Sequence, residues 1–434
     1  MNYIDKKNNF AFLAIAILTL FIAFTNNAQL ANIIMLVLVF FVCLSKTEDN
    51  LILCIYLIPS IDYFNYLGLG YNVVTIFYLL VSIKYFIYFR TIKIKPLGLS
   101  LLIVLLSFEV FHVIYVDGYS LQDFIRWSIL FSFSILVMID GNINLNFLRL
   151  ESAFVNGFLL SSIVGAYLFF YKGKVPVNDN IIPRFSGLSG DPNNFGMYAL
   201  IIIAFMLAKF KYNRASTISL LTILLVLSFS VLTVSRSFFL VLFVIILLQL
   251  SKGWFDLKKS IRNLTFVSVL FVSFYWLLNT EIMDNIILRF SYGNISELSG
   301  SRTDIFDAYF NVFYSLDIYF QLFGAGINGY LDFYNKYSDL YSIVNPGDVV
   351  GPHNTIIEIF VSLGVIGSIV YVLLLIFAMF NNVNIRSDSD KITLFLPVII
   401  IFIYSLSLQN IAKYVFYFLL LLVSFYMRDA KCER

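Results

Sequence analysis

The sequence contains few charged residues for its length. Asp, Glu, Lys and Arg make up 13% of the 434 residues, whereas a soluble globular protein carries roughly 25%. Apolar residues make up 60%, and the mean hydropathy is +0.88. Apolar runs of about 17–25 residues recur along the chain, and a helix needs this length to cross a hydrocarbon layer of about 30 Å. The sequence therefore predicts an all-α, polytopic integral membrane protein.

Several other features are scarce or absent. The three cysteines, Cys43, Cys54 and Cys432, all fall at or beyond expected cytoplasmic helix ends, so we expect neither a disulfide nor a metal cluster. The chain lacks a Walker loop and a Rossmann glycine pattern, which argues against an ATP-driven machine. Its basic residues are dispersed over loops, which gives no nucleic-acid surface. No internal repeat suggests a two-halved transporter.

The apolar runs divide into about 14 transmembrane spans. One of them is expected over Leu51–Asn65 and another over Asn263–Asn279. Lys and Arg are concentrated in short loops on one side, so the positive-inside rule places both termini in the cytoplasm. The predicted organisation is N-terminal transmembrane helices over residues 1–171, a first periplasmic loop over 172–193, central transmembrane helices over 194–280, a large periplasmic loop over 281–353 and C-terminal transmembrane helices over 354–434.

Three of the arginines expected on the outer side, where the positive-inside rule disfavours them, are candidate site residues: Arg184, Arg236 and Arg302. A charge near the membrane centre costs about 2.5–3.5 kcal/mol on insertion scales. An arginine fork binds phosphate in a bidentate way, so the three could hold a diphosphate at the membrane surface. The alternative is structural pairing, of Arg184 with Asp191 or of Arg302 with a nearby aspartate. Arg236 has no acidic neighbour in sequence, which favours a functional role.

His353 closes the large polar loop, directly after Pro352. An imidazole titrates near neutral pH and suits a general base, although a lone histidine is more often structural or merely exposed. Thr355 and Glu358 have the spacing of a capping box, so a helix is expected to start close to Asn354. Gly364, further along this span, permits close helix packing or a bend.

Glu109 and His112 form an (i, i+3) pair on one face of a predicted span. Ionisable residues within a membrane are functional candidates. The alternative is that the pair is structural, with Asp123 and Arg126, at the start of the next span, neutralising Glu109.

Four segments together resemble the O-antigen polymerase and O-antigen ligase superfamily. Their order and spacing match, and all four are expected on the outer side. They are Phe185–Gly187 with Asp191–Asn193, Ser235–Ser237, Ser301–Arg302 followed by Leu322–Gly326, and Gly351–Asn354 followed by Glu358 and Leu363–Gly367.

The resemblance implies a metal-independent membrane glycosyltransferase of the bacterial inner membrane, without a cofactor, that uses a polyprenyl-diphosphate donor. It favours a polymerase, which moves the growing glycan from undecaprenyl diphosphate to a new lipid-linked repeat unit. A chain-length regulator protein is an expected partner of such a polymerase. The alternatives are a ligase that transfers glycan to lipid A-core and, in another class, a transporter of lipid-linked oligosaccharide. The resemblance to the superfamily assigns catalysis to His353. Substrate binding is assigned to Arg236, Arg302, Arg184, Asn354 and Asp191.

Overall fold

The computed structural model describes residues 6–25, 29–66, 73–87, 93–116, 120–143, 145–172, 184–211, 217–251, 268, 302–327, 351–380 and 391–429. Every regular element in these ranges is helical. In chain order they are α1 (Lys6–Thr25), α2 (Leu30–Leu44), α3 (Thr47–Leu57), η1 (Ile58–Ser60), α4 (Ile61–Tyr66), α5 (Val73–Ile87), α6 (Pro96–Tyr115), α7 (Leu121–Ile139), α8 (Phe147–Tyr171), α9 (Pro192–Lys211), α10 (Thr217–Val231), α11 (Arg236–Ser251), α15 (Arg302–Ser315), α16 (Ile318–Phe323), α18 (Thr355–Phe380), α19 (Lys391–Ser405) and α20 (Tyr414–Asp429).

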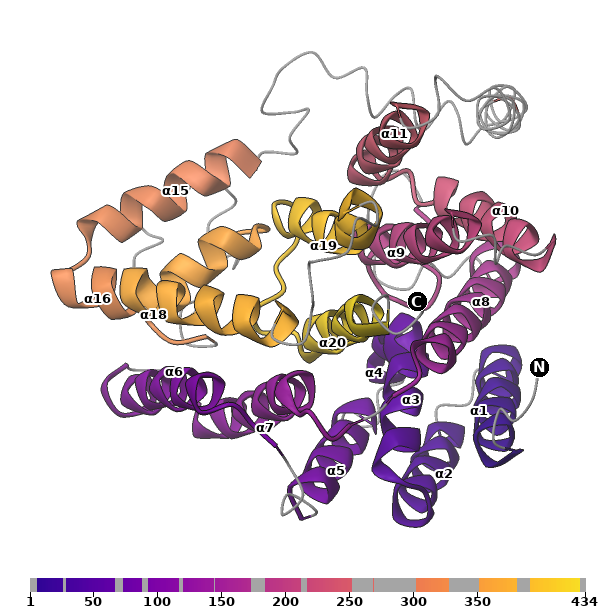
Figure 1. Ribbon diagram of the computed structural model, residues 1–434, viewed down its shortest axis with the longest axis horizontal. Coiled ribbons are helices and arrows are strands. Elements are labelled where there is room, and N and C mark those ends of the chain that lie inside the picture. Colours follow the sequence, from indigo (N-terminus) through magenta and orange to yellow (C-terminus); the bar gives the residue numbers. More distant parts are fainter. Residues whose placement is uncertain are drawn as a thin grey trace.

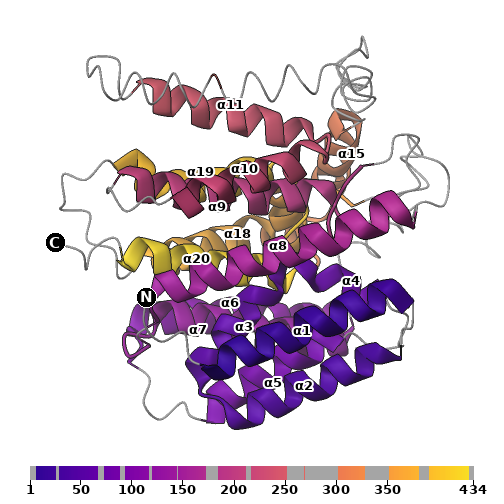
Figure 2. The same ribbon diagram turned by 90° about the vertical axis from the view of Figure 1, so that its right-hand side faces the viewer.

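Within the described ranges, five helices are long and apolar enough to cross a membrane: α6, α7, α8, α9 and α18. Seven shorter apolar helices accompany them, so the expectation of an all-α chain of membrane type is confirmed. The predicted span Asn263–Asn279 lies outside the described residues except at residue 268. Helix α1 begins and α20 ends at the same end of the bundle (Figure 2).

The core of the bundle is built around α9 and α20. Helix α20 is apolar on all sides, and its residues 417–423 are at most 3% exposed. Such a helix needs neighbours on every face, and α20 packs against α3, α7, α8, α18 and α19 (Figure 1). Helix α9 contacts α8, α10, α11 and α19. The N-terminal ends of α9 and α20 are therefore held rigidly among their neighbours.

The predicted span Leu51–Asn65 is not one regular α-helix, which corrects the expectation. A 3₁₀ turn, η1, separates α3 from α4. Proline has no backbone N–H, so in a helix it cannot donate a hydrogen bond to the carbonyl four residues before it. Pro59 lies in this turn. The buried Ser161 hydroxyl of α8 donates a hydrogen bond to the Pro59 carbonyl oxygen at 2.7 Å. Helix α4 then carries Asp62 toward the bundle interior.

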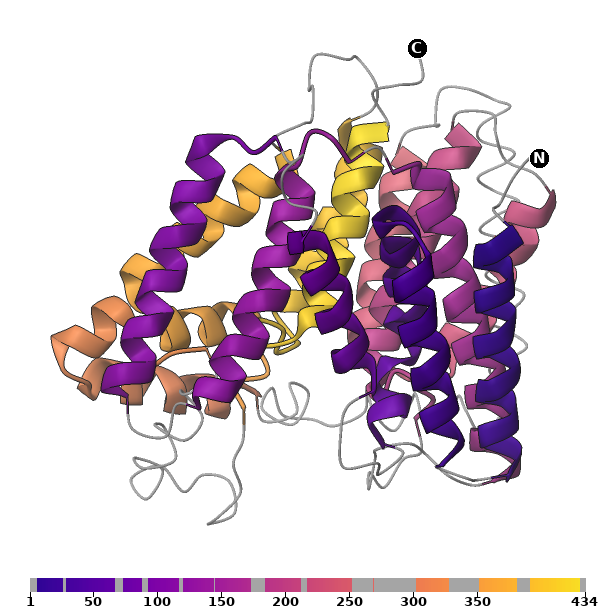
Figure 3. The same cartoon turned by 90° about the horizontal axis from the view of Figure 1, so that it is seen from below.

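Helix α18 bends sharply at Gly364, whose φ is +63° and ψ is −172°. Gly324, at the end of α16, has a φ of +80° and packs against the same bend. Ala325 and Gly326 donate backbone hydrogen bonds to the carbonyls of Val361 and Ser362 at 3.1 and 2.8 Å. The bend expected from glycine in this span is confirmed. It brings α15 and α16 to the end of the bundle opposite the chain termini (Figure 3).

Replacing Gly364 by alanine is expected to destabilise the protein strongly. This backbone region is essentially restricted to glycine and costs other residues about 1–3 kcal/mol. A Cβ at Gly364 would also lie 2.4 Å from the Leu322 carbonyl carbon. The measurement is the thermal unfolding midpoint of the purified protein in detergent. Gly141→Ala is the control, because its nearest neighbour would be 3.9 Å away. Equal midpoints for the two variants would show that the bend is not required.

Glu109 and His112 are fully buried, and their side chains lie 3.3 Å apart. The second carboxylate oxygen of Glu109 accepts a hydrogen bond from the Ile327 backbone at 3.2 Å. The pair therefore ties α6 to the glycine segment that follows α16. Arg126, which was expected to neutralise Glu109, instead donates to the Thr75 hydroxyl at 3.2 Å. The contact between Ile327 and Glu109 favours the structural alternative for the pair, although Arg126 takes a different partner from the one expected.

Candidate functional site

The turn between α10 and α11 carries Arg236 at the first position of α11. Arg184 supports this turn from a distant part of the chain. Its Nε donates to the Thr233 carbonyl at 3.0 Å, and one Nη donates to the Asn193 side-chain oxygen at 3.2 Å. The Ser235 hydroxyl donates to the same Asn193 oxygen at 2.8 Å. Three separate sequence segments thus form one hydrogen-bonded network.

Asp191 begins α9 together with Pro192, which occupies the first helical position. Proline is favoured there because its missing N–H would have no partner. The Asp191 carboxylate accepts a hydrogen bond from the Asn193 backbone at 2.6 Å, and its carbonyl accepts one from Phe195 at 3.1 Å. Asp191 therefore holds the first turn of α9, which presents Asn193 to Arg184.

His353 is exposed and has a φ of +45°. Asn354, at 8% exposure, caps α18 by accepting hydrogen bonds from Ile356 and Ile357 at 2.9 and 3.3 Å. The helix start close to Asn354 is confirmed, but the cap is Asn354 and not the predicted capping box. The Thr355 hydroxyl donates to the Leu408 carbonyl instead, at 2.7 Å. The contact of Thr355 with Leu408 has therefore replaced the capping contact that was expected within the first turn of the helix.

Two non-glycine residues in the described ranges have a positive φ, and both lie here. They are His353 and Val234, whose φ is +49°. For a β-branched residue this conformation is an outlier. Such residues cost of order 1–3 kcal/mol, persist only where the surroundings enforce them, and cluster at functional sites. Backbone strain therefore marks the two turns that carry His353 and Arg236.

The segment that joins α19 to α20 connects these two turns. The Ser237 hydroxyl, next to Arg236, lies 3.3 Å from the Ser407 hydroxyl. Thr355, two residues after His353, donates to Leu408. The buried Glu358 carboxylate accepts a hydrogen bond from the Ile411 backbone at 2.9 Å. The beginnings of α11 and α18 are therefore fixed to one common segment, residues 406–413, which we call the α19–α20 turn.

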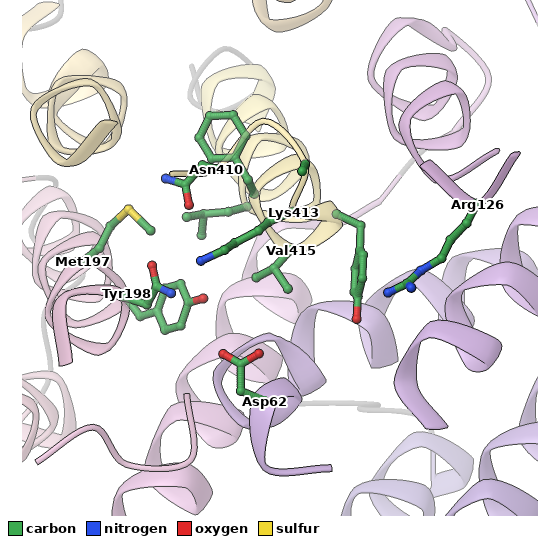
Figure 4. A pocket seen from close by; sticks show the side chains of 12 residues that line it. Asp62, Arg126, Met197, Tyr198, Asn410, Lys413 and Val415 are labelled. Atoms are coloured by element: carbon green, nitrogen blue, oxygen red, sulfur yellow. The ribbon is translucent and has the colours of Figure 1, made fainter. Parts of the chain in front are cut away.

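A cavity of about 210 Å³ adjoins this turn. It lies among α4, α7, α9 and α20, and Figure 4 shows side chains from all four helices converging on it. Its polar lining is formed by Asp62, Arg126, Asn194, Tyr198, Asn410, Lys413 and Tyr414; its apolar lining is formed by Met197, Ala412, Val415, Phe416 and Leu419. Cavities with a mostly fixed apolar wall and a few convergent polar groups are the usual form of small-ligand sites.

Helix α15 covers part of α18 beside the site. Tyr309 is 8% exposed and belongs to a small apolar cluster with Val361 of α18. Burial raises the pKa of the Tyr309 hydroxyl, and the negative charge of Glu358 raises it further. The hydroxyl is therefore protonated at any physiological pH and can act only as a neutral hydrogen-bonding group.

The structure brings together most of the predicted site residues at one end of the bundle. Arg184 and Asp191 both contact Asn193, and Ser235 of the same network directly precedes Arg236. Thr355, which follows His353 and Asn354, contacts Leu408 of the α19–α20 turn. Arg302 begins α15, but its side chain lies outside the described part of the structure. The predicted pairing of Arg184 with Asp191 is mediated by Asn193, which donates its backbone N–H to Asp191.

Sequence reasoning did not select the cavity or Asn193. Arg126 was considered only as a residue that could neutralise Glu109, and Lys413 and Asp62 were not selected. The one available signal was that all three are charged residues at the outer ends of predicted spans. Intramembrane charges of this kind mark ligand pathways, but nothing in the sequence shows that these helices are neighbours.

The described fold and site define a polytopic α-helical membrane protein with a hydrogen-bonded polar network and a cavity lined by two cationic side chains toward one end. A family model described as O-antigen ligase matches residues 199–372. The matched segment includes Arg236, Arg302 and His353. This match confirms the resemblance to the O-antigen polymerase and ligase superfamily that the sequence motifs indicated. No curated protein matches the sequence.

Proposed function

We propose that the protein is a surface-polysaccharide polymerase that works on lipid-linked glycans at the periplasmic face of the bacterial inner membrane. The family supports a membrane enzyme of the glycosyltransferase type that acts in O-antigen biosynthesis. The observation that carries the proposal is the network of Arg184, Asn193 and Ser235. It fixes Arg236 at the end of the bundle that also carries His353.

The proposed topology has about 14 spans, with both termini in the cytoplasm and the loops 172–193 and 281–353 in the periplasm. The common end of α1 and α20 supports an even number of crossings. The cationic site then lies at the outer membrane surface, where an undecaprenyl diphosphate carrier presents its phosphates and its glycan.

In the proposed reaction, an acceptor hydroxyl attacks the anomeric carbon of the donor glycan. The new glycosidic bond forms as the bond between that carbon and the diphosphate oxygen breaks. Undecaprenyl diphosphate leaves with the electron pair. His353 takes the proton from the attacking hydroxyl. Because the diphosphate is already a good leaving group, the scheme calls for neither a nucleotide nor a metal.

Arg236 and Arg302 are proposed to hold the donor diphosphate and to stabilise the charge that develops on it. Arg184 acts in support. Its guanidinium binds the Thr233 carbonyl and Asn193, so its contribution is to position the turn that carries Arg236. Asp191 and Asn354 contribute similarly, because each holds the first turn of a helix on which a site residue depends.

The ligase is the second candidate, because the matching family model is described as O-antigen ligase. A deletion strain separates the two. Loss of a polymerase is expected to leave lipid A-core carrying a single repeat unit, whereas loss of a ligase leaves none and strands polymer on its carrier. Electrophoresis of the extracted lipopolysaccharide is the measurement. A core band without any repeat unit would contradict the polymerase.

Purified protein tests the reaction itself. We expect it to extend lipid-linked repeat units in detergent or in lipid nanodiscs with no other enzyme present. Chromatography of the lipid-linked products should show a ladder of added repeats. A transporter of lipid-linked oligosaccharide would leave the repeat units unextended, and this result would overturn the proposal.

A further inference from the structure

A polymerase must hold two lipid-linked diphosphates at once, one as donor and one as acceptor. The network around Arg236 is proposed to serve the donor. The cavity among α4, α7, α9 and α20 carries a second set of cationic and polar groups that this proposal does not use. We propose that this cavity binds the diphosphate and the adjoining sugar of the acceptor, an inference that rests on the proposed function.

Two cationic side chains reach the cavity from different helices, Arg126 from α7 and Lys413 from the start of α20 (Figure 4). One Nη of Arg126 donates to Thr75, and its guanidinium carbon lies 5.8 Å from the centre of the Tyr414 ring. Thr75 in turn donates to the Tyr414 hydroxyl at 2.9 Å. These contacts fix the guanidinium beside the cavity. A fixed guanidinium fork and an exposed ammonium together suit the several oxygens of a diphosphate.

The first turn of α9 separates the cavity from the donor network. Asn193 points to Arg184 and Ser235 on one side. Asn194, the next residue, lines the cavity on the other. Consecutive residues of an α-helix point about 100° apart, so one helical turn serves both compartments. Two diphosphates can therefore lie at the positive end of the α9 dipole without occupying the same space.

The remaining lining suits a sugar rather than an inorganic ion alone. Asp62, Asn194 and Asn410 offer acceptors and donors for sugar hydroxyls. Met197, Val415 and Leu419 supply an apolar wall on which a sugar ring or the first part of a prenyl chain can pack. With Asp62 ionised, the cavity side chains carry a net charge of +1 from Arg126, Lys413 and Asp62, so an anionic group is favoured.

The test uses farnesyl diphosphate, a short polyprenyl diphosphate, titrated by calorimetry into the purified full-length protein in nanodiscs. The wild type is expected to bind two equivalents. The double variant Arg126→Gln, Lys413→Gln should bind one, Arg236→Gln should bind one, and the triple variant none. Lys172→Gln is the control: this exposed lysine lies at the end of α8, outside the cavity, and should leave two equivalents. Farnesol, which lacks the phosphates, should not compete.

Binding of a single equivalent by the wild type, or two equivalents retained by the double variant, would overturn the second site. Lys413→Gln alone guards against misfolding of the double variant, because Lys413 is exposed; it should weaken one of the two equivalents. Extension of repeat units is measured on the same preparations. If the protein extends repeat units but binds only one equivalent, the second diphosphate site is refuted and the polymerase activity is supported. If it binds two equivalents without extending repeat units, the second site is supported and the polymerase activity is refuted.

Discussion

Replacing Arg236 by alanine is expected to abolish long-chain glycan while the protein still inserts normally. Arg236 stands at the start of α11, directly after the strained turn that Arg184 and Asn193 hold in place. The turn contacts given above do not involve the Arg236 side chain, so truncation should leave them intact. Removing one preorganised donor from a reacting charge typically lowers kcat about 10²–10³-fold. The measurement is the length distribution of surface glycan, together with the level of the variant in the membrane.

Two further variants make the Arg236 result specific. Arg236→Lys keeps the charge but loses the planar fork, so it should restore the activity only in part. Arg149→Ala removes an arginine at the opposite end of the bundle, where it pairs with Asp49 at 3.1 Å. A partly exposed pair of this kind contributes little to stability, so this variant should keep the full ladder. Full-length ladders from Arg236→Ala would remove Arg236 from the donor site.

Replacing His353 by alanine is expected to lower the rate of transfer about 10²–10⁴-fold, the usual contribution of a general base. Binding of the donor diphosphate should not change, because that contact is assigned to arginines. The measurement is the extension rate at saturating donor, with farnesyl diphosphate binding as the companion readout.

The backbone of His353 supplies the control for that experiment. Its φ of +45° favours glycine and asparagine over other residues. His353→Gly and His353→Asn should therefore fold at least as well as the alanine variant, yet remain as inactive. If either variant recovered transfer, the position would matter for the shape of the turn and not for its imidazole.

The membrane character of the chain could be predicted well because it depends on composition. Runs of apolar residues must form helices in hydrocarbon, where every backbone group needs a partner within the segment. The predicted helix start close to Asn354 accordingly corresponds to the start of α18 at Thr355. The 3₁₀ turn at Pro59 was missed because it depends on a hydroxyl from α8 and on the close passage of Gly157 beside the Tyr56 carbonyl.

The site was predictable only in part. Arg184, Asp191, Arg236 and His353 were recognisable as polar residues in unusual places. Arg184 and Asp191 both contact Asn193, and Arg236 follows Ser235 of the same network. The capping box at Thr355 failed because a tertiary acceptor, the Leu408 carbonyl, competes for the same hydroxyl. Local spacing describes what a side chain can do, whereas a packed neighbour decides which option it takes.

The sequence by itself determined the class of protein, the polar end of the bundle and the resemblance to a family, since hydropathy and short motifs are properties of the chain alone. The tertiary structure alone decided which polar residues meet. Arg126 and Lys413 are 287 positions apart, yet both line one cavity because α7 packs against α20. Helix packing sets that proximity through the shapes of many side chains together, and no short stretch of sequence contains this information.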